Sequence, residues 1–279
     1  MKHFFYSLIA LIGLSFNHVV ASPYYVGENP TPDSTVNLNF TNTVTEARGT
    51  LDSGNIAAFE LRAIGQVGPN VGLLGGFPFY SASENAVGSG GENALGNINL
   101  GFNWNQSLSK TTDVFRWGYF GAGDLFLPSS RSTEGNTVAM VNPTADLYRY
   151  LPYATTFNPR VGVFASQNYW SAKANLDYAY SYVSRNSFGS NDKNRNSFRM
   201  QTGGSWHPMQ NLNVNLEYNT IWLDDATSDQ RGSFRQALVP SVSGIYNKMV
   251  GNAFVSIPLD APTRDLATLA FGLSGGYQF

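Results

Sequence analysis

Polar and apolar side chains alternate with a period of two residues in one stretch after another of this sequence. In NLNVNLEYNTIW, at 211–222, asparagine and glutamate occupy almost every second position, and mostly leucine, valine, tyrosine and tryptophan stand between them. Successive side chains of a β-strand point to opposite faces, so the pattern is that of a strand with one polar and one apolar face. The same alternation recurs at 97–105 and 170–182. The sequence therefore predicts an all-β protein.

About 12 such stretches follow one another, and many of them reach the length of a membrane-crossing strand. Strands of globular proteins are mostly about 5–6 residues long, whereas a tilted strand that crosses a membrane needs about 9–11. We expect strands near 35–46, 55–65, 70–80, 95–107, 112–127, 153–166, 169–184, 196–206, 210–223, 236–246, 248–258 and 265–279.

The connections between these strands alternate between tight turns and long polar loops. The tight turns are predicted at 67–70, 107–110, 167–168, 207–210 and 247–248. The long loops are predicted at 81–93, 128–152, 186–196, 224–235 and 260–264. Short turns on one side and long loops on the other are typical of an outer-membrane barrel. We therefore expect residues 35–279 to form a single transmembrane antiparallel β-barrel of about 12 strands.

A β-sandwich also has one apolar face per strand, so the positions of the aromatic residues decide between the two folds. One group of aromatic residues falls near the tight turns: Trp104, Trp170, Trp206, Tyr246, Tyr277 and Phe279. A second group falls near the long loops: Tyr180, Tyr182 and Trp222. Two aromatic belts around an aliphatic band are typical of the two interfaces of a bilayer, which favours the membrane barrel.

The N-terminal residues have the order of a secretory signal peptide. Lys2 and His3 precede an apolar run, and small residues lead to a cleavage site after Ala21. The apolar run is shorter than the about 20 residues of a transmembrane helix, so cleavage is favoured over anchorage. We expect a signal peptide at 1–21, a periplasmic segment at 22–34, and localisation in the bacterial outer membrane.

Composition argues against several classes of function. The chain has 17 Lys+Arg and 19 Asp+Glu and no basic stripe, so nucleic acid is not an expected partner. It has no cysteine and three histidines, which argues against a transition-metal site. Charged residues make up 13% of the sequence, less than a soluble surface usually carries. We expect no cofactor and no metal.

The last residues resemble the assembly signal of bacterial outer-membrane proteins, which ends on an aromatic residue with a second one two places earlier. Here these residues are Tyr277 and Phe279, and Ser274 stands where the signal usually has glycine. The resemblance implies that the barrel assembly machinery recognises this strand.

The stretch GYFGAGDLFLP, at 118–128, combines a glycine-rich strand containing GD with a terminal LP. Together with the following loop and strand pair it resembles a family of porin-like barrels linked to phenol meta-pathway degradation. The resemblance covers the middle third of the chain. It implies the uptake of small molecules, often aromatic or apolar, and does not name a substrate.

An outer-membrane hydrolase is the main competing class, and by resemblance such barrels pair histidine with serine or with acids. Once the signal peptide is removed, the remaining histidine is His207, which we expect in the turn at 207–210, far from the outer rim. We therefore predict no catalytic residues. Asp224, Asp225 and Asp229 could gather Ca²⁺ or bridge lipopolysaccharide, but a solvated cluster is the favoured interpretation.

Strand parity places nine charged side chains on the inward, polar faces of the barrel. They are Glu60, Arg62, Arg116, Asp124, Arg160, Lys173, Asp177, Arg199 and Glu217. Two interpretations remain open. These groups form a charged constriction along a polar pathway, or they form a paired ionic network that fills a narrow barrel.

Two further features bear on transport. The stretch NPTADLYRYL, within the loop 128–152, could form a helical turn and fold inward as a constriction, although a surface loop is favoured. Pro78, Pro159 and Pro240 fall within or at the ends of strands, where each removes a backbone donor. They mark either a lateral opening toward the bilayer or, more commonly, bulges and strand ends.

These observations predict a porin-type channel for the passive uptake of small molecules. The alternative is a structural or surface-interaction barrel with a plugged lumen, whose extracellular loops bind a partner. The expected partners are outer-membrane lipid and lipopolysaccharide, the barrel assembly machinery, and small-molecule solutes. The oligomeric state is left open.

Overall fold

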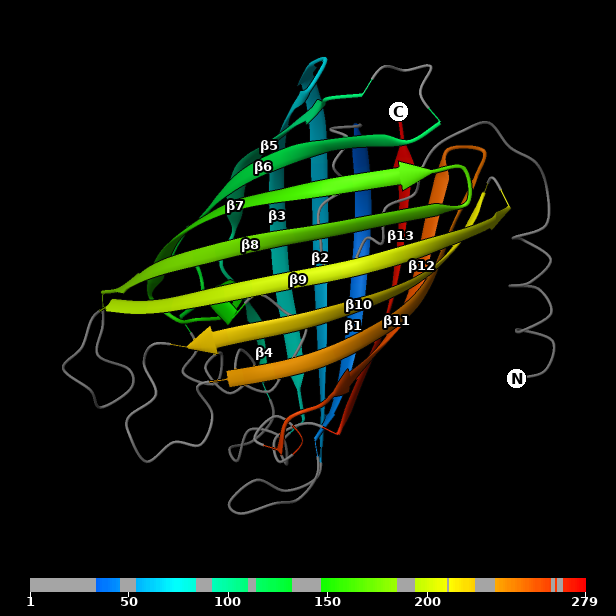
Figure 1. Ribbon diagram of the computed structural model, residues 1–279. Coiled ribbons are helices and arrows are strands. Elements are labelled where there is room, and N and C mark those ends of the chain that lie inside the picture. The colour runs from blue at the N-terminus through cyan, green and yellow to red at the C-terminus, as the bar shows by residue number, and fades with distance from the viewer. Residues whose placement is uncertain are drawn as a thin grey trace.

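The computed structural model of the protein contains one continuous sheet of tilted strands (Figure 1). It describes residues 34–45, 54–83, 92–109, 114–131, 147–184, 194–209, 211–223, 234–261, 264 and 268–279. The expected signal peptide and residues 22–33 of the periplasmic segment lie outside the described residues. Within the described residues, no helix has the length and apolarity needed to cross a bilayer.

The described residues form thirteen strands and one short 3-10 helix. The strands are β1 (Thr35–Thr45), β2 (Gly54–Gly68), β3 (Val71–Ala82), β4 (Glu92–Leu95), β5 (Asn99–Ser107), β6 (Arg116–Phe126), β7 (Ala154–Gln167), β8 (Trp170–Val183), β9 (Asn194–Met209), β10 (Leu212–Leu223), β11 (Phe234–Tyr246), β12 (Met249–Pro258) and β13 (Leu269–Gln278). The helix, η1, spans Leu147–Arg149.

The sheet closes on itself because the first and last strands pair. β1 and β13 run antiparallel from the pair Thr35–Gln278 to the pair Val44–Leu269, and β1 also pairs with β2. β3 pairs with β5 near the turns and with β4 near the loops, so β4 and β5 share one place in the ring. The result is the predicted 12-strand antiparallel barrel. A closed barrel leaves no backbone edge without partners in hydrocarbon.

The two faces of the barrel wall separate by side-chain type, as the period-two pattern predicts. In β8, Asp177 and Ser181 are buried on the inner face, whereas Leu176, Tyr178 and Tyr180 are exposed on the outer face. Large apolar side chains are exposed on the outward faces of most of the other described strands as well. A wall with this outward apolar face is suited to lipid.

Tight turns gather at one end of the barrel, here called the turn end; the opposite end is the loop end. Asn247 and Lys248 connect β11 and β12 in two residues and both have positive φ, of 46° and 69°. This is the turn geometry that matches the twist of paired strands. The rings of Trp170 and Trp206 lie 6.3 Å apart on the outer face at the turn end. Trp222 is exposed at the loop end.

The strand expected at 95–107 is broken. Gly96 donates its N–H to the carbonyl of Pro78 at 2.7 Å, but the N–H of Asn97 leaves the sheet and donates to the carbonyl of Arg149 at 2.5 Å. The break between β4 and β5 therefore arises because the backbone at Asn97 bonds to a segment that follows β6. A long-range contact of this kind is not visible in strand periodicity.

The turn expected at 207–210 is also corrected. β9 continues to Met209, and its register against β10 shifts between the pairs Met209–Leu212 and Trp206–Val214. His207 and Pro208 thus face the single residue Asn213, which is the geometry of a β-bulge. Proline is tolerated there because a bulge leaves one residue without a ladder partner.

Candidate functional site

The barrel interior contains eight of the nine charged residues that parity assigns to it. Seven of them are buried on inward-facing positions: Glu60, Arg62, Asp124, Arg160, Asp177, Arg199 and Glu217. Lys173 faces inward from β8 and is half-buried, and Arg116 is exposed at the turn end of β6. Seven buried ionisable groups in one interior must be paired to be tolerated.

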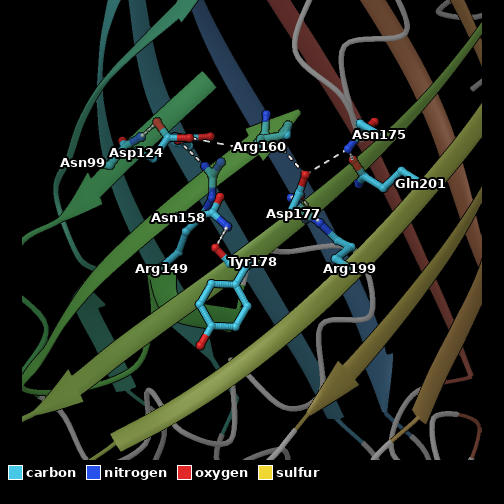
Figure 2. A network of polar contacts seen from close by, with 11 residues as sticks. Asn99, Asp124, Arg149, Asn158, Arg160, Asn175, Asp177, Tyr178, Arg199 and Gln201 are labelled. Carbon is cyan, nitrogen blue, oxygen red and sulfur yellow. Dashed lines mark hydrogen bonds and ion pairs between the residues drawn. The ribbon is translucent and has the colours of Figure 1, made fainter. Parts of the chain in front are cut away.

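An ionic network across β6, β7, β8 and β9 joins four of these residues (Figure 2). The register sets Arg160 opposite Asp177, and Asp177 opposite Arg199. Asp177 accepts hydrogen bonds from Arg160 Nε at 3.0 Å and from Arg199 Nε at 2.6 Å. Arg160 Nη2 also lies 3.6 Å from Asp124 Oδ2. One carboxylate thus bridges two guanidinium groups, and the network extends toward β6.

Amide side chains complete this network. Asn175 donates from Nδ2 to Asp177 Oδ1 at 2.9 Å and to Gln201 Oε1 at 2.8 Å. On the other side, Asn99 Nδ2 lies 3.4 Å from Asp124 Oδ1. Asparagine at alternate strand positions therefore provides neutral donors that reach into the charged row, and these contacts hold the carboxylates in place.

A second ion pair lies beside the network. Lys173 and Glu217 stand on either side of Gly203, because the register sets Gly203 opposite both residues. Their Nζ and Oε1 atoms are 3.5 Å apart, which is longer than a charge-assisted hydrogen bond. A Cβ at Gly203 would lie 2.8 Å from Cγ of Glu217. Glycine at this position therefore gives the Glu217 side chain the space to reach toward Lys173.

Residues 147–153, here called the inner segment, fold into the barrel at its loop end. Asn97 fixes them: its Nδ2 donates to the carbonyls of Tyr148 and Leu151, each at 2.7 Å. Its Oδ1 accepts the N–H of Ser130 at 3.0 Å. A single buried side chain thus satisfies three backbone groups of a connection that would otherwise lack strand partners.

Aromatic packing and an ion pair hold the inner segment against the wall. The ring of Tyr148 lies 4.7 Å from that of Phe126, and the ring of Tyr150 meets that of Tyr80 edge-on at 5.6 Å. Arg149 forms an ion pair with Glu60 on β2. For this part of the loop 128–152, the inward fold with a helical turn is the correct alternative; residues 132–146 lie outside the described residues.

Several inward-facing residues were missed by sequence reasoning. Arg195 and Arg235 fall in the predicted loops 186–196 and 224–235, but each is the second residue of its strand and faces the interior. Extending the strand pattern by two residues would have found them. Arg149 carries no local signal, and Asn97 was expected to face inward but not to bind this segment, because these contacts join segments about fifty residues apart.

The prediction that His207 lies in a turn is wrong. His207 lies within β9 and faces the interior near the turn end. Its Nε2 lies 3.0 Å from Ser171 Oγ, and its Nδ1 is hydrogen-bonded to Asn213 Oδ1. His207 and Ser171 are both half-buried. A serine hydrogen-bonded to a histidine, which is in turn hydrogen-bonded to an amide, is the arrangement of a nucleophile, a base and an orienting group. The bulge in β9 brings these three side chains together.

None of the three strand prolines lies at a strand end. Pro159 lies between the pairs Phe157–Tyr180 and Arg160–Asp177, and the ladder is interrupted there without a change in register. Pro240 lies inside β11 in the same way. Pro78 lies inside β3 where its partner changes from β5 to β4, and there two residues of β3 face three of the partner, as the bulge interpretation expects. Each proline therefore removes a ladder bond locally, and the strand pairing continues beyond it.

The acidic cluster expected in the loop 224–235 is not tested by the structure. Asp224, Asp225 and Asp229 lie outside the described residues, and the described residues contain no cluster of three metal-ligating side chains.

Comparison with known proteins gives matches at the level of structure. No protein-family model matches the chain, and no curated protein matches it in sequence. An outer-membrane channel from Pseudomonas putida F1 superimposes with a TM-score of 0.63 at 13% identity, over 94% of this chain and 100% of that chain. The chain has the fold of outer-membrane β-barrels. The NanC porin is similar too, with a TM-score of 0.56 at 6% identity, over 88% of this chain and 100% of that one.

Both matched structures are described as a channel or a porin, and neither is described as an enzyme. At such low identity the likeness establishes the architecture alone.

Proposed function

We propose that the protein is a porin-type channel for the passive movement of small molecules across a bacterial outer membrane. The observation that carries the proposal is the charged row inside the barrel, from Asp124 through Arg160 and Asp177 to Arg199. A purely structural barrel would be filled at lower cost by apolar side chains, because buried ion pairs contribute little net stability. The channel and porin structures that share this fold support the proposal.

The channel that we propose is gated. Asp177 is 2% exposed and Glu217 is 1% exposed, so neighbouring side chains cover both carboxylates in the conformation described here. The inner segment covers the interior at the loop end through Arg149 and the two tyrosines beside it. We infer that displacement of the inner segment, together with rearrangement of the ion pairs, opens the pathway.

The plugged barrel is the second candidate, and the same burial favours it. If the inner segment and the ionic network never separate, the protein spans the membrane without conducting, and its long loops bind an outside partner. Lipid and lipopolysaccharide around the outer face, and the assembly machinery at β13, are proposed partners in either case.

We propose that the protein is not an enzyme, and one observation favours the opposite. Ser171, His207 and Asn213 have the contacts of a hydrolytic triad, but they lie inside the barrel near the turn end. Purified protein should not release nitrophenol from p-nitrophenyl esters above the level of the Ser171→Ala variant. A serine-dependent release would establish the hydrolase instead.

Planar-bilayer recording of the purified protein tests the channel proposal. We expect discrete current steps in wild type. A barrel that inserts, shows the heat-modifiable migration of a folded barrel and never conducts would contradict the channel and support the plugged alternative.

A further inference from the structure

The barrel wall is interrupted at the loop end, beside the break between β4 and β5. Within the described residues, β4 pairs with β3 along one edge, and its other edge has no ladder partner. The ladder between β5 and β6 ends with the bond from the N–H of Leu127 to the carbonyl of Ile98 at 2.8 Å. From there to the loop end, residues 92–97 and residues 128–131 lie on the two sides of an interruption, here called the seam.

Side-chain hydrogen bonds close the seam where the backbone ladder stops. Ser129 Oγ accepts the N–H of Ile98 at 2.8 Å and donates to the carbonyl of Gly96 at 2.8 Å. Asn97 Oδ1 accepts the N–H of Ser130 at 3.0 Å. These bonds satisfy backbone groups that would otherwise lack partners in hydrocarbon. Because they involve only two side chains at the end of a ladder, they can separate while the flanking strands stay paired.

The inner segment lies directly behind the seam. Asn97 donates its backbone N–H to the carbonyl of Arg149 at 2.5 Å, and its Nδ2 to the carbonyls of Tyr148 and Leu151. A Cβ at Gly96 would lie 2.6 Å from the Arg149 carbonyl oxygen, so the two backbones are in contact. The Asn97 side chain therefore binds the inner segment through Nδ2 and closes the seam through Oδ1. Displacement of the inner segment removes the partners of Nδ2 and frees this side chain to release the seam.

The outer face of the wall around the seam is apolar. Leu95 on β4 and its ladder partner Phe79 on β3 are both exposed on this face. On the other side of the seam, Leu125 on β6 and Phe157 on β7 are exposed as well. Exposed apolar side chains on a barrel wall indicate contact with hydrocarbon at that height. A solute that passed through the seam would enter this apolar phase, which excludes charged molecules.

We propose that the seam is a lateral exit, through which small uncharged apolar molecules pass from the loop end of the barrel into the bilayer when the inner segment is displaced. The inference rests on the proposed channel function and its gate, and it names the exit and the solute class. Ions do not enter lipid and move along the barrel axis instead. Asn97 is the residue that couples the seam to the inner segment.

Uptake of N-phenyl-1-naphthylamine by intact cells tests the role of Asn97. This uncharged apolar dye fluoresces when it enters an apolar phase, and the lipopolysaccharide leaflet slows its entry. Cells that produce wild type should take up the dye faster than cells without the protein, and Asn97→Ala should raise the rate further. Asn103→Ala is the matched control, because Asn103 is also a buried asparagine on this stretch but makes no side-chain hydrogen bond within the described residues. Its rate should equal that of wild type at equal amounts of heat-modifiable barrel.

Cross-linking tests the seam itself, since the chain has no native cysteine. Leu95 and Pro128 are exposed and stand next to Gly96 and Ser129, which are hydrogen-bonded across the seam. A short bifunctional thiosulfonate that joins Leu95→Cys to Pro128→Cys should abolish the protein-dependent uptake of the dye, and dithiothreitol should restore it. Each single-cysteine variant, treated with the same reagent, should keep the wild-type rate.

Three results would contradict the inference in distinct ways. An equal rise in uptake in Asn97→Ala and Asn103→Ala would overturn the coupling through Asn97. Undiminished uptake by the cross-linked protein, in a barrel that still gives current steps in planar bilayers, would overturn the lateral exit and leave the channel standing. A protein with neither current nor uptake above that of cells without it would overturn the channel, and the inference with it.

Discussion

Arg160 and Asp177 face each other across β7 and β8, with Arg160 Nε 3.0 Å from Asp177 Oδ1. Arg199 approaches the same carboxylate from β9, with its Nε 2.6 Å from Oδ2. Asp177 on β8 therefore lies between two buried guanidinium groups, one on β7 and one on β9. Its negative charge therefore stabilises the interior by neutralising both guanidinium groups.

Substitution of Asp177→Asn should destabilise the barrel without changing its shape. The change leaves Arg160 and Arg199 close together without their shared anion, and stranding a buried charge costs about 3–5 kcal/mol. The temperature at which the heat-modifiable band converts to the unfolded form should fall. If the variant conducts, its selectivity should also move toward anions.

Tyr178, which follows Asp177 in β8, tests which face of this strand points toward lipid. Tyr178→Asp places a charge on the lipid face, which costs up to a few kcal/mol near the midplane, and should impair insertion rather than selectivity. Tyr178→Phe should be close to neutral. Equal folding defects in Asp177→Asn and Tyr178→Asp, with no effect on selectivity, would contradict the assignment of faces in β8.

Adjacent glycines in β9 provide a matched test of the ion pair beside the network. Gly203→Ala places a Cβ 2.8 Å from Cγ of Glu217 and should cost about 1–3 kcal/mol, as overpacking usually does. In Gly204→Ala, the nearest atom to the new Cβ is the carbonyl oxygen of Ser171 at 3.8 Å, so this variant should unfold at the wild-type temperature. A similar loss in both variants would mean that Gly203 does not serve the Lys173–Glu217 contact.

The ion pair between Arg149 and Glu60 should control how long the channel stays closed. Arg149→Gln removes the charge that ties the inner segment to β2 and leaves a buried carboxylate, so the segment should leave the lumen more often. Single-channel recordings should show shorter closed times, and therefore a higher open probability, than in wild type. Arg149→Lys keeps the charge and should resemble wild type more closely. Identical gating in all three proteins would exclude the inner segment as the gate.

Strand parity predicts the face of each interior residue but not its partner. Leu176 and Tyr178 are apolar, so Asp177 between them must point inward, and the structure agrees. Its pairing with Arg160 and Arg199 depends on the relative heights of three strands. Those heights depend on turn lengths and on local irregularities such as the bulge at His207, which a pattern of period two does not record.

Contacts outside the strand pattern were not predictable in the same way. Asn97 occupies a position in an alternating stretch that predicts an ordinary inward-facing asparagine, yet it breaks the strand and binds the inner segment. Arg149 lies in a loop whose inward fold was only one of two interpretations. The contacts of Asn97 and Arg149 join segments that lie far apart in the chain, so no single stretch of sequence contains the pattern that would predict them. Arg195 and Arg235 were missed for a simpler reason, because their strands begin earlier than the pattern suggested.

The orientation of the barrel can be tested because the chain has no native cysteine. Ser83 lies at the loop end and Ser107 at the turn end, and both are exposed. A single cysteine at Ser83 should react with a membrane-impermeant maleimide on intact cells, and a single cysteine at Ser107 should react after the outer membrane is opened. The opposite pattern would place the long loops in the periplasm. Ser89 and Ser190, which also fall in predicted loops, lie outside the described residues.

The last residue should govern assembly more than final stability. Phe279 donates its N–H to the carbonyl of Ser34 at 2.9 Å, its ring lies 5.3 Å from that of Tyr277, and its side chain is 70% exposed. An exposed aromatic residue at a strand end anchors a barrel at the interface. Phe279→Ser, or its deletion, should slow assembly and leave unfolded protein in the periplasm, whereas Phe279→Tyr should assemble normally. Pulse-chase labelling followed by heat-modifiable migration measures the rate. A Phe279→Ser protein that folds as fast as wild type would show that the terminal aromatic is not an assembly signal.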